Sequence, residues 1–412
     1  MKRIIFLNRF FFPDHSATSQ ILSDLAFHLA GVGGDIHVVT SQQRYDDSRA
    51  GLPASEEIRG VTVHRVPTTR FGRSNLVGRG FDYASFYASL WRAVNRIARP
   101  GDTLVAKTDP PMLGDLAMHA ARRRQAHLVN WLQDLYPEVA IKLGVPFVNG
   151  RLGPFLTRLR DRSLRSAKAN VVIGERMAAK LRERGIPADR IHVIPNWCDD
   201  ETIRPASETE NPLRRAWGLE GKFVVGYSGN LGRAHEFETI LDAARRLWDE
   251  TRIIFVVIGG GHMIEEFSRQ AKQLHLDRHF RFLPYQDQAT LNYSLGVPNL
   301  HWISLKPELE GLIVPSKFYS IAAVARPMVV IAANAGELAS LVARHQCGFV
   351  IEPGDSAALA DLLTRLAHDS SSLPEMGNAA RKMLDVHFSR RQAFDKWQGV
   401  LDKVSTEQAV TC

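Results

Sequence analysis

The sequence contains little cysteine and no apolar run long enough to cross a membrane. Three cysteines are scattered over 412 residues, at Cys198, Cys347 and Cys412. This spacing excludes a disulfide framework and a CxxC metal site. The longest nearly apolar stretch, 321–336, is interrupted by Arg326 and is shorter than a transmembrane helix. The N-terminal residues also lack a complete secretory apolar run, so we expect a cytoplasmic protein.

The chain is too long for one ordinary hydrophobic core, and its composition is globular, with 45% hydrophobic and 23% charged residues. Short aliphatic and β-branched runs alternate with helical patterns, as in βαβ units on a parallel sheet. The predicted strands are 3–7, 36–40, 61–66, 103–107, 127–132, 169–173, 191–194, 223–227, 253–258, 280–283, 300–304, 328–331 and 348–351. They predict an α/β protein with two Rossmann-like, doubly wound domains facing a central cleft. We place these domains at 1–196 and 213–388, with a linker at 197–212.

Positive charge is concentrated in the first half of the chain. Residues 1–200 hold 29 Lys and Arg against 19 Asp and Glu, whereas residues 201–412 hold 23 against 25. A basic half joined to a near-neutral half predicts an anionic partner. No nucleic-acid module is recognisable and few aromatics interleave the basic clusters, which favours an anionic membrane or phosphorylated lipid over nucleic acid.

Two glycine-rich turns follow strands of the second half. The strand 223–227 runs into S-G-N-L-G-R at 228–233, and the strand 253–258 runs into three glycines before a helix. Glycines let the backbone approach an anion, and a helix N-terminus favours phosphate. The alternative is a pair of ordinary tight turns with a surface arginine. The candidate ligand contacts are Gly229, Asn230, Gly232, Arg233, Gly260 and Gly261.

Two later segments add candidate contacts. Pro284 and Tyr285 follow the strand 280–283, where they can pack on a flat base, although ordinary loop packing is the alternative. The segment E-G-L-I-V-P-S-K at 310–317 places a carboxylate, backbone N–H groups and a cation within one turn, suited to sugar hydroxyls and phosphate. Here the alternative is a helix capped by serine with a solvated lysine. The candidates in this segment are Glu310, Gly311, Leu312, Ile313, Pro315, Ser316 and Lys317.

Taken in order, these motifs carry a family resemblance. The series Y-S-G-N-L-G-R, V-I-G-G-G, F-L-P-Y and E-G-L-I-V-P-S-K resembles glycosyltransferases of the GT-B fold, retaining family 4, over nearly the whole chain. It is most similar to the branch that builds capsule, O-antigen and colanic-acid polysaccharides on a lipid carrier. The resemblance implies transfer of a hexose or N-acetylhexosamine from a nucleotide sugar, with UDP favoured over GDP. The implied acceptor is a polyprenyl-diphosphate-linked sugar or another saccharide.

The resemblance also implies roles for the first half and for the C-terminus. Ala17 and Thr18 would lie beside the bound diphosphate-sugar, and Asp134 would contact the reacting sugar. Judged from the residues alone, Ser16 or Thr18 is a helix cap and Asp134 a cap or turn carboxylate. A last helix within 389–412 would cross back to the N-terminal domain.

The sequence departs from the family pattern at two places. No D-x-D pair occurs, so we expect no metal and no cofactor, with Arg233, Lys317 and helix N-termini neutralising the leaving diphosphate. The glutamate that holds the ribose in many family members is replaced, by Ser320 when counted from Arg326 or by Phe318 when counted from Glu310. The usual ribose contact is therefore absent, which leaves donor identity open.

The segment 151–168 reads as an amphipathic basic helix. Leucines and a phenylalanine share one face, and arginines lie mostly opposite. Such a helix can rest on the inner face of an anionic cell membrane, and a core-facing helix with a solvated basic face is the alternative.

Two other functions fit parts of this pattern. A nucleotide-sugar epimerase shares the architecture but needs no acceptor and has little use for a basic half. A degenerate homologue would bind a membrane or a partner protein without catalysis. Sugar transfer that is lost on changing Glu310 or Lys317 would separate an active transferase from the degenerate homologue.

Overall fold

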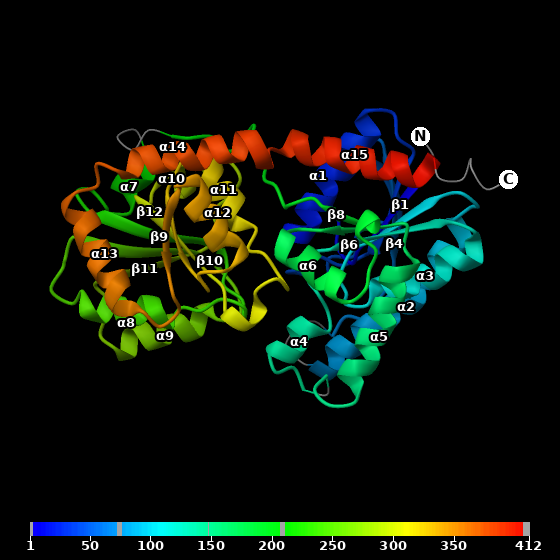
Figure 1. The fold of residues 1–412 in the computed structure, drawn as a ribbon, viewed down its shortest axis with the longest axis horizontal. Coiled ribbons are helices and arrows are strands. Elements are labelled where there is room, and N and C mark those ends of the chain that lie inside the picture. The colour runs from blue at the N-terminus through cyan, green and yellow to red at the C-terminus, as the bar shows by residue number, and fades with distance from the viewer. Residues whose placement is uncertain (1–2, 72–75, 147, 207–210, 407–412) are drawn as a thin grey trace. The chain divides into compact units, whose positions relative to one another are not determined.

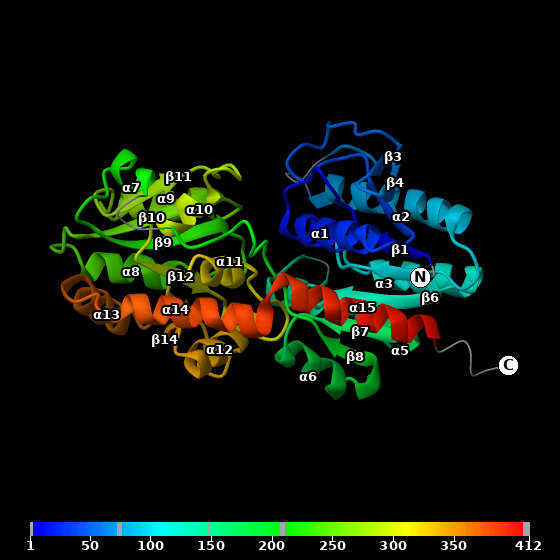
Figure 2. The ribbon, with the colours of Figure 1, turned by 90° about the horizontal axis from the view of Figure 1, so that it is seen from above.

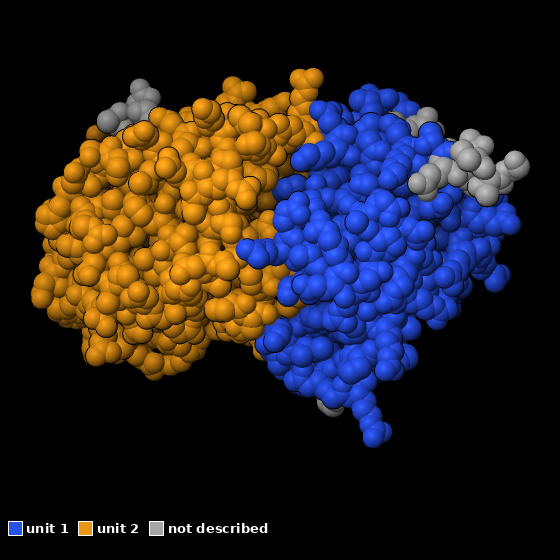
Figure 3. All heavy atoms as spheres, in the orientation of Figure 1, with its two compact units in different colours: residues 1–195, 393–412 blue, residues 196–392 orange. Residues whose placement is uncertain are grey.

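The computed structural model describes residues 3–71, 76–146, 148–206 and 211–406. The chain forms two compact units (Figures 1 and 3). Unit 1 combines Met1–Pro195 with Ala393–Cys412, and unit 2 comprises Asn196–Gln392. Each unit is built on one mainly parallel sheet, so the prediction of two Rossmann-like α/β domains is confirmed. Among the described residues, no helix is both long and apolar enough to cross a membrane.

The sheet of unit 1 has eight strands in the order β3-β4-β2-β1-β5-β6-β7-β8. Central strands are buried along their whole length, as expected for parallel strands covered by helices on both faces. The edge strand β3 was not predicted, because S-E-E-I is polar; it runs antiparallel to β4. The strands are β1 (Ile4–Leu7), β2 (Ile36–Ser41), β3 (Ser55–Ile58), β4 (Val61–Val66), β5 (Thr103–Ala106), β6 (His127–Leu132), β7 (Ala169–Val172) and β8 (Ile191–Val193).

The helices of unit 1 include a layer in which α3 lies between α2 and α5 (Figures 1 and 2). Apolar residues of α2 and α3, such as Phe86, Leu90 and Ala117, pack with Ile5 and Leu104 of the central strands. The helices are α1 (Ala17–Gly31), α2 (Leu76–Ile97), α3 (Leu113–Arg124), α4 (Glu138–Lys142), α5 (Leu152–Ser166), α6 (Glu175–Glu183), the 3-10 turn η1 (Ala188–Arg190) and α15 (Arg390–Thr406).

The C-terminal helix α15 completes unit 1. Its Phe394 ring stacks on His28 at a centroid distance of 4.2 Å, and Trp397 lies 4.5 Å from Trp131 of β6. Both α15 side chains are buried. The expectation that the last helix returns to the N-terminal domain is therefore confirmed, and a residue far along the chain supports the end of β6.

Unit 2 has a six-stranded parallel sheet in the order β11-β10-β9-β12-β13-β14, and every strand predicted for this half is present. The strands are β9 (Phe223–Asn230), β10 (Ile253–Gly260), β11 (Phe280–Leu283), β12 (Leu300–Ser304), β13 (Met328–Ile331) and β14 (Gly348–Ile351). The helices are α7 (Pro212–Ala216), α8 (Glu238–Arg246), α9 (Ile264–Gln273), α10 (Leu291–Gly296), the 3-10 turn η2 (Pro307–Leu309), α11 (Lys317–Ala323), α12 (Glu337–His345), α13 (Ser356–His368), α14 (Leu373–Met383) and the π-helical turn η3 (Leu384–Phe388).

Candidate functional site

The glycine-rich ends of β9 and β10 lie side by side in unit 2. Gly229 pairs with Gly259, and the Leu231 N–H donates to the Gly260 carbonyl at 2.7 Å. A Cβ on Gly259 would lie 2.2 Å from the Gly229 carbonyl oxygen, and one on Gly261 would lie 2.6 Å from Asn230 Oδ1. Side chains at these two positions would therefore push the turns apart. The two predicted turns form one continuous backbone edge.

An exposed aromatic ring stands beside this edge. Tyr285 is 60% exposed, and a Cβ on Gly260 would lie 3.0 Å from its ring. Pro284 is exposed next to it, and Arg233 is exposed on the turn that follows β9. The edge thus brings a flat aromatic surface, bare backbone and a cationic side chain into one unit.

Lys317, the first residue of α11, reaches back to the same strand ends. Its ammonium lies 3.7 Å from the centroid of the Tyr227 ring and donates to the Tyr227 hydroxyl. The Lys317 Cε would be 3.6 Å from a Cβ on Gly229. Burial holds the pKa of Lys317 well below its ordinary value, and no carboxylate among the described residues pairs with it. The site therefore contains an amine held by the Tyr227 hydroxyl and ring and by His235, with no carboxylate of the described residues beside it.

His235 helps to hold Lys317. Its Nδ1 lies 2.7 Å from the Ser304 carbonyl oxygen, which can only accept, so Nδ1 carries the proton and donates. The other ring nitrogen, Nε2, is then an acceptor that faces Lys317 Nζ at 3.5 Å. Burial, assisted by Lys317, lowers the pKa of His235 to about 3. The imidazole is therefore neutral at physiological pH and adds no positive charge to the site.

Glu310 precedes Lys317 by seven residues and is tied to a helix start. Its Oε1 accepts the Glu337 N–H of α12 at 2.7 Å. A Cβ on Gly336 would lie 2.6 Å from Oε2, so glycine is needed where the carboxylate meets the helix. The carboxylate is partly exposed and its orientation is fixed by α12.

The loop between Glu310 and Lys317 is compact. Gly311 has a φ of 71°, a left-handed conformation that glycine adopts without strain. Leu312 and Pro315 are buried, and Ile313 forms an isolated bridge with Glu310. Ser316 occupies the N-cap of α11, but its side chain makes no capping hydrogen bond.

The two residues considered at the ribose position differ in accessibility. Phe318 is fully buried, so its side chain belongs to the core of unit 2. Ser320 is partly exposed, and its hydroxyl donates to the Lys317 carbonyl of the same helix at 3.0 Å. Neither side chain offers the carboxylate that the family pattern would place there.

Unit 1 has a cavity of about 30 Å³ at the carboxyl ends of β5 and β6, enough for about two waters. Asp134 and Lys107 both line it. Lys107 Nζ lies 3.5 Å above the Trp131 ring and has no hydrogen-bond partner among the described residues. Burial lowers the pKa of Lys107 well below its ordinary value, against the opposing charges of Asp134 and Asp109. Burial, reinforced by Asp109, raises the pKa of Asp134 to about 6.

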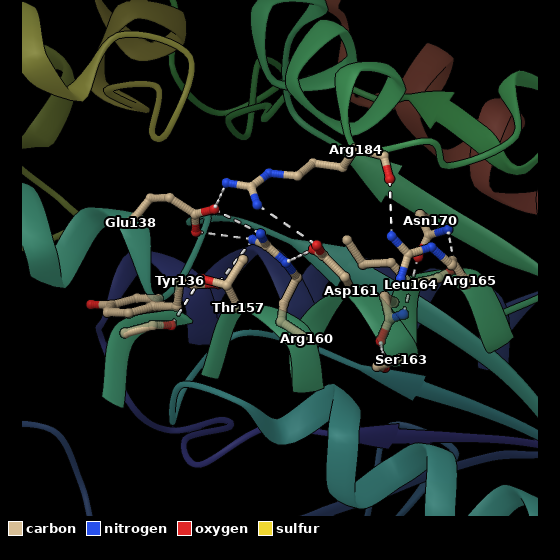
Figure 4. Close-up of polar contacts among 12 residues, drawn as sticks. Tyr136, Glu138, Thr157, Arg160, Asp161, Ser163, Leu164, Arg165, Asn170 and Arg184 are labelled. Atoms are coloured by element: carbon tan, nitrogen blue, oxygen red, sulfur yellow. Dashed lines mark hydrogen bonds and ion pairs between the residues drawn. The ribbon is translucent and has the colours of Figure 1, made fainter. Parts of the chain in front are cut away.

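The loop that carries Asp134 is fixed by Arg160 of α5 (Figure 4). The Arg160 guanidinium donates to the Tyr136 carbonyl at 2.9 Å and to both Glu138 oxygens at 2.7 and 3.1 Å. Its Nε donates to Asp161 at 2.7 Å, and Arg184 also contacts Glu138, at 2.9 Å. Three charge-assisted hydrogen bonds from Arg160 therefore hold the segment after Asp134 against α5, and Arg184 adds a contact from the end of α6.

The loop before α1 is organised by Asp14. Its Oδ1 accepts the Ser16 N–H at 2.8 Å and the Ser16 hydroxyl at 2.5 Å. Ser16 is the N-cap of α1, but its side chain is used by Asp14 and caps nothing. Ala17 is exposed and Thr18 partly exposed at the first turn of α1. These two residues are thus held at an ordered and accessible helix start.

Comparisons with known proteins identify the family of each half of the chain. The family described as "Glycosyl transferase 4-like domain" matches residues 17–197, and that described as "Glycosyl transferases group 1" matches residues 222–369. The chain is a GT-B glycosyltransferase.

Individual relatives match over most of their length. WbjE of Pseudomonas aeruginosa, named as a glycosyltransferase, is 27% identical over 351 residues, 83% of this chain and 85% of that protein. WcaI of Escherichia coli K12, named as a colanic acid biosynthesis glycosyl transferase, is 26% identical over 341 residues, 80% and 83% of the two chains. The structure of Anabaena HepE in complex with UDP superimposes with a TM-score of 0.72 at 17% identity, covering 98% and 100% of the two chains.

Three residues of this glycosyltransferase lie beside the candidate site residues without being among those expected from the sequence. Tyr227 and His235 surround Lys317, and Lys107 shares the cavity of Asp134. Lys107 had a detectable signal, because a lysine directly after a buried parallel strand points to the edge where ligands bind. Tyr227 had none, since it occupies an inward position of β9.

Ionisation of Asp134 should destabilise the glycosyltransferase. Its pKa rises from 3.8 to about 6 in the folded protein, which binds the proton more tightly than the unfolded chain. Stability from this group is present at low pH and is lost as pH rises through about 6. We expect Asp134→Asn to raise the unfolding temperature at about pH 8 and to lose this advantage below about pH 4. Thermal unfolding across pH measures this, with the exposed Asp242→Asn as control; equal shifts in both variants would contradict it.

Proposed function

We propose that this glycosyltransferase moves a sugar from a nucleoside-diphosphate sugar, with UDP as the favoured carrier, to a saccharide acceptor in surface polysaccharide synthesis. The observation that carries the proposal is the position of the Lys317 amine beside the glycine backbone at the ends of β9 and β10, where no carboxylate of the described residues pairs with it. A diphosphate supplies a negative charge for this amine. The HepE structures in complex with UDP and with UDP-glucose, and the printed name of WcaI, support the choice of donor and pathway class.

In this proposal, unit 2 holds the donor. The N–H groups around Gly229, Asn230, Gly232, Gly260 and Gly261, together with Arg233 and Lys317, neutralise the diphosphate, as does the loop Gly311, Leu312, Ile313, Pro315 and Ser316. Tyr285 and Pro284 pack on the base, and Glu310 accepts sugar hydroxyls in the orientation that α12 imposes. The developing charge is stabilised by fixed donors, so we expect transfer to proceed without added metal.

Unit 1 contributes Ala17, Thr18 and Asp134 in the same proposal. Asp134 contacts the reacting sugar or the acceptor, and Ala17 and Thr18 lie near the diphosphate-sugar. The acceptor hydroxyl attacks from the side of the leaving group, so the anomeric configuration is retained. A polyprenyl-diphosphate-linked sugar is the preferred acceptor, and the enzyme works at the inner face of the cell membrane.

Calorimetric titration of the full chain with UDP, GDP, ADP and NAD, without metal, tests the donor site. We expect saturable binding of one nucleoside diphosphate, UDP first. Tyr285→Ala should weaken that binding about fivefold to tenfold by removing a stacking face, whereas Tyr285→Phe should keep it. Exposed Tyr293→Ala on the same unit is the matched control. Binding of none of the four ligands would overturn the proposed donor site.

A further inference from the structure

The outer face of the α2, α3 and α5 layer carries exposed charge of one sign. The three acidic residues of these helices are largely shielded from solvent: Asp82 and Asp161 are buried, and the Asp115 side chain is 20% exposed. Besides His119, the exposed ionisable side chains on the described parts of these helices are Arg92, Arg96, Arg122, Arg123, Arg158, Arg162 and Arg165. We call these seven arginines the arginine face.

Exposed apolar side chains occupy the first two turns of the two flanking helices. Val77 and Phe81 of α2 are 67% and 59% exposed, and Phe71 lies 6.0 Å from Phe81 and is 60% exposed. On α5, Leu152 and Phe155 are 42% and 53% exposed. Large apolar groups left in water at defined places mark an interaction surface.

The topology puts these apolar groups at one end of the layer. Helices α2 and α5 each connect strands of the parallel part of the sheet, so both begin at its carboxyl edge. Arg92 and Arg96 lie at the far end of α2, and Arg162 and Arg165 lie at the far end of α5. The layer therefore has an apolar margin at its carboxyl-edge end, and the arginines lie further along the helices.

We propose that the arginine face and its apolar margin dock on an anionic lipid bilayer. A helix rich in arginine on its outer side, with phenylalanine and leucine at one end, suits the interface where lipid headgroups meet acyl chains. Each basic residue near such a surface adds attraction, and seven act together. Nucleic acid would bind the arginines alone, because its phosphates offer nothing to apolar side chains. A bilayer binds the arginines through its headgroups and also buries the apolar margin among its acyl chains.

The docking surface and the Asp134 cavity share helix α5. Arg158 and Arg162 are exposed, whereas Arg160 between them is buried and holds the Asp134 loop through Tyr136 and Glu138 (Figure 4). Residues two apart in a helix lie on opposite sides. If the proposed acceptor is lipid-linked, docking brings it to the unit whose cavity contains Asp134; this link rests on the proposed function, whereas the docking surface itself does not.

Co-sedimentation of the full chain with vesicles tests the surface. We expect binding to vesicles of mixed phosphatidylglycerol and phosphatidylcholine and none to phosphatidylcholine alone. Arg123→Glu/Arg158→Glu/Arg162→Glu should weaken binding roughly a hundredfold. The matched control, Arg245→Glu/Lys272→Glu/Arg344→Glu, makes the same charge change at exposed positions of unit 2 and should stay within about twofold of wild type. Both triple variants should unfold at the same temperature as wild type, which would show that a difference in vesicle binding does not arise from misfolding.

A second pair of variants separates a bilayer from other polyanions. Phe81→Ser/Phe155→Ser should bind anionic vesicles in low salt but release at lower NaCl than wild type, because only the apolar contribution is lost. Equal losses in the two charge-reversal variants would overturn the proposal. So would a serine variant with wild-type salt resistance, or duplex DNA that displaces the protein from vesicles at equal charge concentration. Failure of nucleotide binding would leave these outcomes unaffected.

Discussion

Replacing Lys317 with methionine is expected to lower sugar transfer by about two to three orders of magnitude, the usual cost of losing one charge-stabilising donor. Nucleoside-diphosphate binding should weaken in parallel. The same substitution should leave unit 2 at least as stable as wild type, because Lys317 is an amine whose charged form is penalised by burial and has no carboxylate partner among the described residues. Loss of activity together with retained or increased stability is the result that identifies a binding cation.

Titration calorimetry and thermal unfolding of the same preparations measure both effects. Lys272→Met, an exposed lysine on α9 of the same unit, is the control and should change neither. If Lys317→Met lowers the unfolding temperature and leaves nucleotide binding intact, Lys317 is a structural residue that packs on Tyr227, and the donor site lies elsewhere.

Arg160→Met is expected to destabilise unit 1 by about 3 kcal/mol, because Glu138 and Asp161 lose their buried partner and keep only the partly exposed Arg184. Arg160 is 7% exposed and bridges Glu138, Asp161 and the Tyr136 carbonyl. Its loss should free the loop after β6. Hydrogen exchange should therefore accelerate at 134–142 before other parts of unit 1, which mass spectrometry of peptides resolves.

Arg184→Met provides a matched comparison at the same carboxylates. The Arg184 side chain is 41% exposed and meets Glu138 and Asp161 at 2.9 and 3.7 Å. A partly solvated arginine of this kind contributes at most about 1 kcal/mol. Equal destabilisation by the two variants would show that burial of Arg160 is not what stabilises the loop.

Much of the fold could be predicted from the sequence, because parallel strands buried on both faces read as continuous apolar runs. The misses were segments stabilised by distant partners. The polar strand β3 exists through its pairing with β4. The packing of helix α14 also depends on a distant partner, because a Cβ on its Gly377 would lie 2.1 Å from the Ala325 carbonyl oxygen. That glycine reads as a helix breaker in the sequence, yet it permits a close packing contact that no local pattern reveals.

The candidate site, too, could be predicted where its residues are close in sequence and could not where they meet only in the fold. Glu310 and Lys317 are close in sequence and could be found together, and the glycine turns could be found from their strand ends. The contacts of Lys317 with Tyr227 and His235 join segments 90 and 82 residues apart, so they depend on the folded sheet. The contact between neighbouring turns that requires glycine at positions 259 and 261 is likewise visible only in the folded sheet.

The return of α15 to unit 1 sets an order of events during synthesis. The ribosome completes all of unit 2 before it releases Trp397, which covers Trp131 beside Lys107. At elongation rates of about 5–20 residues per second, the first unit waits roughly 10–40 s for its last helix. During that interval the Trp131 ring lacks its final cover. In a nascent chain, the first unit therefore leaves the ribosome first but is completed last, and its exposed apolar surface needs protection from aggregation until then.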